Sequence, residues 1–223
     1  LNDGDNWRNV GQALFPAAQA ALGEALVREL ADALPRALES EAGSQRMQKT
    51  LALAVGVTHY AETHTFPPVE YAQSDAEAVA KGLVAAGLDP LHVTTLTDSR
   101  ATAAALRAAL ADWTDRLQEG DQAVVYFGGY GTRDAEGAPQ LLLHDADGAG
   151  AGTFSLAELA ELLAALPATS LVVLDCGFDG QGRSVPGGAA ATADDLAALA
   201  EAGIVFAGSR RGSAHLSPSH AEA

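Results

Sequence analysis

The 223-residue chain contains a single cysteine and a single methionine, and its basic residues are few. One cysteine excludes an internal disulfide framework. Only 13 lysines and arginines stand against 29 aspartates and glutamates, so the formal net charge is −16. Nucleic-acid-binding proteins usually present a basic face, and this charge argues against such a partner. We expect the acidity mainly to keep the protein in solution.

Long apolar runs are also missing. No run approaches the roughly 18 residues that a membrane-spanning helix needs, and no signal-peptide pattern is present. The chain has no G-x-x-x-x-G-K-[ST] motif, and its first predicted strand lacks G-x-G-x-x-G, so neither nucleotide-binding fingerprint is met. We therefore expect a cytoplasmic protein without cofactor and without a membrane partner. Because the chain begins at Leu1 rather than methionine, we expect it to be part of a longer polypeptide.

Residues 1–48 have the periodicity of a helical extension. Leucines recur there at multiples of four, with charged residues on the other faces, which is typical of an amphipathic helix. These leucines are Leu14, Leu22, Leu26, Leu30, Leu34 and Leu38. The stripe is expected to pack on the following domain or on a second helix of its own. The alternative is a helix that binds a partner or forms an oligomer.

Residues 49–208 change to alternating strands and helices. Strands are predicted at 51–57, 91–96, 123–127, 171–175 and 204–207, with a short one at 141–143. Ser74 and Ser155 each open a capping box, Asp98 or Ser99 is expected to cap the helix between them, and Thr192 or Asp194 to start the last helix. Such alternation predicts a mostly parallel sheet with helices on both faces. Residues 209–223 read as a polar loop.

Two predicted strands end abruptly in glycines. One runs from Val124 through Gly128, Gly129, Tyr130 and Gly131, and the other from Leu171 to Gly180. A buried parallel strand has this pattern when it delivers a loop to a functional edge of the sheet.

Both strand ends closely resemble the two active-site segments of the caspase-like cysteine peptidases, the group of caspases, metacaspases and paracaspases. In that family the third strand ends in Ser-Gly-His-Gly and the fourth in Asp-Ala-Cys-(His/Phe)-Ser-Gly. Here Tyr130 stands at the position of the histidine and Gly177 at that of the cysteine. Three further segments resemble the family in the correct order, at 51–60, 67–76 and 141–146, so the likeness spans about residues 50–207.

The resemblance implies a three-layer α/β sandwich with strand order 2-1-3-4-5 and a site at the carboxyl ends of strands three and four. Catalysis in this family needs a thiolate and a nearby imidazole. A tyrosine titrates near 10 and does not replace the imidazole, and Gly177 offers no nucleophile. We therefore interpret the chain as a catalytically inactive relative that acts as a protein-interaction, scaffold or regulatory module. Its expected partners are other proteins or other domains of the same polypeptide.

Cys176 is a candidate for a displaced nucleophile. Side chains alternate across a strand, so a shift of one residue points it to the opposite face. The simpler interpretation is a small buried apolar residue. The alternative is an active peptidase that uses Cys176 with His144 or His59 as base.

The remaining candidates concern binding at the former cleft, which Gly129 and Gly131 flank. Asp175 aligns with an acidic residue that, in metacaspase-like members, helps to bind basic side chains; hydrogen bonds to loop amides are its alternative role. Phe127, Tyr130 and Phe178 either fill the cleft or line a retained groove for a peptide, and a small-molecule sensor is a further alternative.

Metal binding is not expected. Asp145 and Asp147 form only a fragment of a calcium-loop pattern, and Asp179 does not complete it. His215 and His220 lie in the polar tail and are expected to be solvated.

Overall fold

The computed structural model describes residues 49–177, 197–210 and 213–216, so the predicted extension of residues 1–48 lies outside them. Within the described residues the main sheet has six strands in the order β2-β1-β3-β7-β8-β9, and a small sheet has three in the order β4-β5-β6. The strands of the main sheet are β1 (Thr50–Gly56), β2 (Val93–Thr97), β3 (Asp121–Gly128), β7 (Ala168–Asp175), β8 (Val205–Arg210) and β9 (Ser213–Leu216). Those of the small sheet are β4 (Gly131–Arg133), β5 (Pro139–Leu142) and β6 (Thr153–Ser155).

The first five strands of the main sheet are parallel, in the order β2-β1-β3-β7-β8. This confirms the predicted order 2-1-3-4-5. Beyond them, β9 pairs antiparallel with β8. The expectation of a loop after residue 208 is therefore wrong for Ser213–Leu216, and β8 itself continues to Arg210. This strand has the sequence Ser-Ala-His-Leu, and four residues are too few for its alternation of polar and apolar residues to distinguish a strand from a loop.

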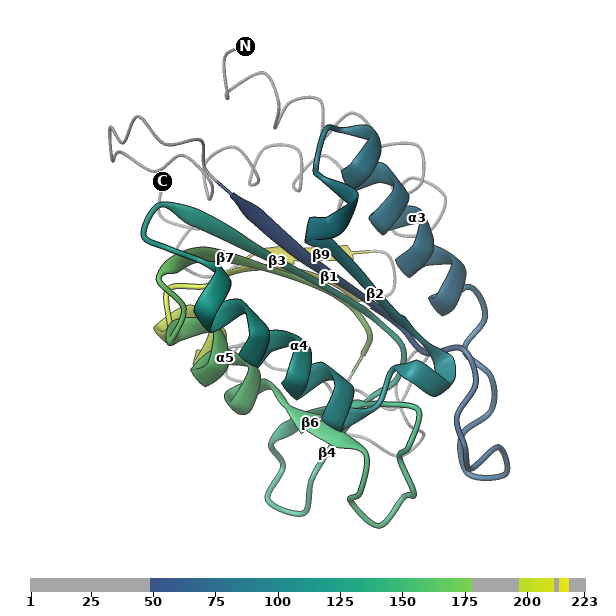
Figure 1. Ribbon diagram of the computed structural model, residues 1–223. Coiled ribbons are helices and arrows are strands. Elements are labelled where there is room, and N and C mark those ends of the chain that lie inside the picture. The colour runs from purple at the N-terminus through teal and green to yellow at the C-terminus, as the bar shows by residue number, and fades with distance from the viewer. Residues whose placement is uncertain (1–48, 178–196, 211–212, 217–223) are drawn as a thin grey trace.

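Helices cover both faces of the sheet, which confirms the three-layer architecture. In Figure 1, α3 (Ala72–Ala85) lies on one face, and α4 (Ala103–Arg116) and α5 (Leu156–Ala164) lie on the other. The remaining described helical segments are α6 (Ala197–Glu201) and two single 3₁₀ turns at Pro90–His92 and Asp98–Arg100, on either side of β2. The alternation of strand and helix produces these layers because each crossover lays a helix back on the sheet.

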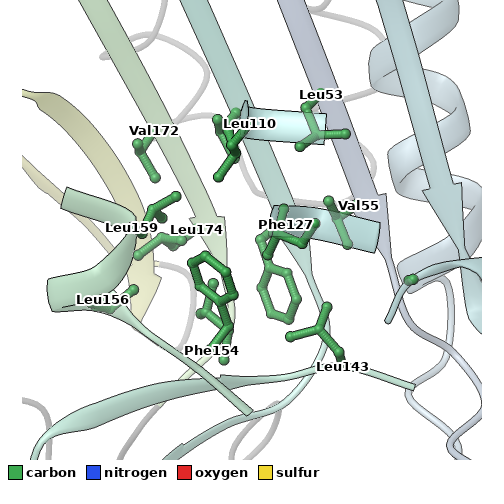
Figure 2. Packing of buried hydrophobic residues seen from close by; sticks show 14 of the residues in the cluster. Leu53, Val55, Leu110, Phe127, Leu143, Phe154, Leu156, Leu159, Val172 and Leu174 are labelled. Carbon is green, nitrogen blue, oxygen red and sulfur yellow. The ribbon is translucent and has the colours of Figure 1, made fainter. Parts of the chain in front are cut away.

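The main core lies between the sheet and the α4–α5 layer. Figure 2 shows alternate residues of β1, β3 and β7 pointing at this layer, and β6 closing one end of the core. The labelled side chains are Leu53, Val55, Leu110, Phe127, Leu143, Phe154, Leu156, Leu159, Val172 and Leu174. Burial of each such side chain contributes about 1.5–3 kcal/mol. The core therefore holds the carboxyl ends of β3 and β7 in fixed positions.

On the opposite face, α3 approaches β1 very closely. A Cβ atom at Gly56 would lie 2.3 Å from the carbonyl oxygen of Ala72 and 2.7 Å from the Cβ of Ala76. Glycine at position 56 is therefore required for this contact.

The start of α3 differs from the prediction. Ser74 does not cap the helix, which begins two residues earlier, after Tyr71. The amide of Gln73 donates instead to the hydroxyl of Thr58, at 2.9 Å. Ser74 donates its own hydroxyl to the Tyr71 carbonyl. The cap comes from a residue 15 positions upstream, which a local capping pattern does not contain.

Of the other predicted caps, one is wrong and one is confirmed, while Thr192 and Asp194 lie outside the described residues. Neither Asp98 nor Ser99 caps α4, because the Thr102 hydroxyl accepts the Ala105 amide at 3.1 Å and takes that role. The carboxylate of Asp98 is already engaged with the amides of the loop that follows β1. For α5 the prediction is confirmed, since the Ser155 hydroxyl accepts the Glu158 amide at 2.9 Å.

Candidate functional site

The carboxyl end of β3 is packed against aromatic rings on both faces. A Cβ atom at Gly128 would lie 3.0 Å from the Tyr126 hydroxyl, and one at Gly129 would lie 3.0 Å from both Phe127 Cζ and the Tyr60 hydroxyl. Both glycines therefore leave room for neighbouring aromatic side chains. The glycine run that marked this strand end in the sequence has a packing role here.

Tyr130, which the sequence resemblance aligns with the histidine of the caspase-like peptidases, is buried with 9% of its surface exposed. Its amide donates to the hydroxyl of Tyr60 at 2.8 Å, and its carbonyl accepts the Leu142 amide at 3.0 Å. The Tyr60 hydroxyl in turn donates to the Leu142 carbonyl at 3.4 Å. These bonds join the end of β1, the end of β3 and β5 at one point.

The rings of Tyr60, Phe66 and Tyr130 form an aromatic cluster. The centroids of Tyr60 and Tyr130 are 5.4 Å apart, those of Tyr60 and Phe66 5.5 Å, and those of Phe66 and Tyr130 6.5 Å. Burial raises the pKa of the Tyr130 phenol, and it raises the pKa of the Tyr60 phenol far above its usual range. Both phenols are therefore neutral at physiological pH, and neither is a proton acceptor of the kind that an imidazole provides.

Asp175 lies at the end of β7, beside Gly128 in the parallel register. Its side chain is buried with 5% exposed, and Oδ2 accepts the Tyr126 hydroxyl at 3.4 Å. Its carbonyl accepts the Gly129 amide at 3.4 Å. The carboxylate is thus engaged inside the protein rather than directed into solvent.

Cys176 is buried with 7% exposed and belongs to the core cluster that contains Val172 and Leu174. Its side chain continues the alternation of β7 and joins the α4–α5 face of the sheet. Gly177, which the sequence resemblance aligns with the cysteine of the caspase-like peptidases, is half-buried. Phe178, the third proposed cleft residue, and Asp179 lie outside the described residues.

His59 and His144 lie together beyond the ends of β1 and β5. His59 Nδ1 is 2.9 Å from Asp98 Oδ2, and His144 Nδ1 is 2.6 Å from the His59 carbonyl oxygen. Asp98 Oδ1 accepts the amides of Thr58 and His59 at 2.8 and 3.0 Å. Burial opposes the charge on Asp98, but these hydrogen bonds outweigh it and lower the pKa of its carboxyl. The imidazoles are thereby oriented as parts of the loop structure.

The candidate calcium carboxylates hold their own loop. Asp145 Oδ1 accepts the Ala103 amide at the start of α4, and Asp147 Oδ1 accepts the amides of Ala149 and Ala151. Within residues 49–177, 197–210 and 213–216, no three His, Cys, Asp or Glu side chains gather as a metal site would require. His215 lies on β9, and His220 lies outside the described residues.

Sequence reasoning missed two residues of this region, Tyr60 and Tyr126. Tyr60 lies in the segment 51–60 that resembles the family's opening strand, and its hydroxyl accepts the amide of Tyr130, which is 70 positions away. Tyr126 lies within the apolar run of β3, and nothing in that run distinguishes it from its neighbours. The signal for it was the glycine pair that follows, because a large ring beside glycines has space to lie along the strand.

In the part of the chain that the structure describes, no helix is long and apolar enough to cross a membrane.

Strand order, layers and the placement of positions 130 and 177 at adjacent strand ends define an α/β domain of the caspase-like class. A model of the CHAT domain family matches residues 13–212. The chain therefore belongs to the CHAT domain family, which is related to the caspase-like cysteine peptidases. The match begins inside the segment 1–48 that the sequence pattern separated as an extension.

Among solved structures, the chain is similar to the protein GSU0716 from Geobacter sulfurreducens. The two are 19% identical, with a TM-score of 0.55, over 74% of this chain and 75% of that chain. At this identity the likeness establishes the fold alone. A search of curated proteins gave no match.

Proposed function

We propose that this CHAT domain is a catalytically inactive relative of the caspase-like peptidases and works as a protein-interaction module. The observation that carries the proposal is Tyr130, buried in an aromatic cluster where the family has its catalytic histidine. A buried phenol with a raised pKa does not take a proton from a thiol at neutral pH. The proposal includes partners that are proteins or other domains of the same polypeptide, and a cytoplasmic location.

The end of β7 supports the same proposal. Gly177 has no side chain to act as a nucleophile. Asp175, which would attract a basic side chain in a working cleft, is buried and accepts the Tyr126 hydroxyl. The polar group nearest the former site is therefore already satisfied inside the fold.

Burial of Cys176 weighs against the peptidase alternative. A reactive thiol is partly exposed and lies in a setting that favours the thiolate. Cys176 is 7% exposed and packs with the apolar residues of β7. A substrate carbonyl does not reach this sulfur without a rearrangement of the strand end.

Alkylation with iodoacetamide tests this reading of Cys176. We expect the thiol of the native protein to react only at the rate at which the protein unfolds. A plot of the alkylation rate against pH should show no midpoint below the usual range of a free cysteine. The matched control is Gly177→Cys in a Cys176→Ala background, where the thiol moves one residue on to a half-buried position and should react faster. Rapid, pH-dependent alkylation of native Cys176 with a depressed midpoint would support the peptidase instead.

The interaction role has a separate test. Proteins that bind the full-length polypeptide should remain intact during long incubation with it, and they should bind the Cys176→Ser variant equally well. The double substitution Tyr130→His with Gly177→Cys should still fold cooperatively, because both positions are those of the family's site. A bound protein that is cut by the wild type and spared by Cys176→Ser contradicts the proposal.

A further inference from the structure

The outer edge of β2 forms one border of the main sheet. β2 is at one end of the main sheet, and within the described residues it pairs only with β1 (Figure 1). Its first four residues are half-buried, whereas every residue of β1 and β3 is buried. A strand of this kind presents a row of backbone donors and acceptors along its outer side.

This edge lacks the usual protection against pairing. Natural edge strands carry lysine, proline, bulges or inward-pointing charges that prevent another strand from adding to them. β2 has the sequence Val-Thr-Thr-Leu-Thr, without charge, proline or glycine, in a chain with 42 charged residues, from 13 basic and 29 acidic ones. Leu91, just before it, is 83% exposed. β-Branched residues and leucine favour further strand pairing.

We propose that β2 is a self-association edge, and that its occupant is β2 of a second copy of this chain, in antiparallel pairing around Thr95. The two-fold axis then stands normal to the sheet, and the two sheets join into one. In this register Thr95 faces Thr95 of the second copy, Val93 faces Thr97, and Thr94 faces Leu96. Threonine and β-branched residues are favourable cross-strand neighbours. The contact is isologous, so it closes at a dimer.

Charges on either side of β2 favour a second copy. The turn before β2 carries the exposed Asp89, and the turn after it carries the exposed Arg100. Two further charges lie at these ends, but each already has a partner in the same copy: Asp98 pairs with His59, and Arg116, which donates to the Leu91 carbonyl, pairs with Asp112. Antiparallel pairing brings the first turn of one copy beside the second turn of the other, so opposite charges meet at both ends. A parallel partner strand would bring like ends together instead.

The dimer is expected to be weak. Five paired residues bury less than the roughly 800 Å² per partner of a standard interface. Two molecules of charge −16 also repel each other, and salt screens that repulsion. Association through an uncharged strand should therefore strengthen as the salt concentration rises.

The test is sedimentation equilibrium of the full chain over a wide range of concentration, at low and at high salt. We expect a monomer–dimer equilibrium with tighter association at high salt. Thr95→Glu and Thr95→Lys each place two like charges opposite one another, and each should weaken the dimer about tenfold or more. An equimolar mixture of the two variants should restore association, because only the mixed pair has opposite charges at position 95.

Thr132→Glu and Thr132→Lys are the matched controls, since Thr132 is a half-buried threonine on β4 of the other sheet. They should leave the dimer unchanged, and circular dichroism should show that all four variants are folded. A chain that stays monomeric at every concentration overturns the proposal, including the case in which residues 1–48 occupy the edge. The proposal is also overturned if each Thr95 variant alone dimerises as tightly as the wild type, or if the mixture of the two variants dimerises no more tightly than either variant alone.

Discussion

The hydroxyl of Tyr126 lies 3.4 Å from Oδ2 of Asp175, and both side chains are buried. The two residues come from adjacent parallel strands, and Gly128 provides the space that the tyrosine ring needs to reach the carboxylate. The Asp175 carboxyl group is therefore held within the protein.

Tyr126→Phe removes the hydroxyl donor and leaves the rest of the ring in place. An ordinary hydrogen bond contributes about 0.5–1.5 kcal/mol, and this one is long at 3.4 Å, so we expect a loss of about 0.5–1 kcal/mol. Chemical denaturation measures it. Tyr71→Phe is the control, since this tyrosine is 67% exposed and its hydroxyl is accessible to water. Equal stability of the two variants would show that the Tyr126–Asp175 contact contributes nothing.

Tyr60→Phe tests the bonds that fix the end of β3. The buried Tyr130 amide loses its acceptor, and the Leu142 carbonyl loses a donor, so the free energy of unfolding should fall by about 1–3 kcal/mol. Tyr130→Phe keeps the amide and the ring, and should cost less. If the order of the two losses were reversed in denaturant titrations, the aromatic cluster would depend on the Tyr130 hydroxyl rather than on Tyr60.

Gly56→Ala and Gly129→Ala compare a close contact with backbone atoms and a close contact with side-chain atoms. At Gly56 the added methyl meets the Ala72 backbone at 2.3 Å, whereas at Gly129 it meets the side chains of Phe127 and Tyr60 at 3.0 Å. Backbone yields less than side chains, so we expect a loss of about 3 kcal/mol or more at Gly56 and about 1–2 kcal/mol at Gly129. Thermal unfolding ranks them. A smaller loss at Gly56 would mean that α3 moves freely relative to β1.

Asp98 gives the loop after β1 a dependence on pH. Its carboxyl has a lowered pKa in the folded protein, so its hydrogen bonds stabilise the fold fully above the ordinary value of about 3.9. This stabilisation is lost as the pH falls through the lowered pKa. In Asp98→Asn the acceptor oxygen does not titrate in this range.

The measurement for Asp98 is the free energy of unfolding of both proteins from neutral to acid pH. The difference between wild type and Asp98→Asn should be largest near neutrality and shrink toward acid. Parallel profiles over the whole range would contradict the assignment.

The parts of the fold that could be predicted are those fixed by residues close together in the sequence. Strands β1, β3 and β7 are buried on both faces and therefore appear as continuous apolar runs, and Ser155 caps α5 with a residue three positions away. The caps of α3 and α4 were missed because Thr58 acts across a loop and Asp98 serves that same loop. Strand β9 has only four residues, too few for its alternation of polar and apolar residues to serve as a signal.

Of the candidate site, the sequence placed Tyr130 and Gly177 at adjacent strand ends through the family resemblance alone. It did not predict that Tyr60 and Phe66 pack against Tyr130, because these residues lie 70 and 64 positions before it in the sequence. The surroundings of a strand end depend on such distant side chains, which a local sequence pattern does not contain.

Among the described residues at the ends of β3 and β7, we propose that no nucleophile with a working base faces solvent. Incubation of the purified wild-type protein with a diverse library of fluorogenic peptides, with and without calcium, tests it most directly. We predict no turnover above that of Cys176→Ala. Cleavage after lysine or arginine by the wild type, abolished in Cys176→Ala, would contradict it.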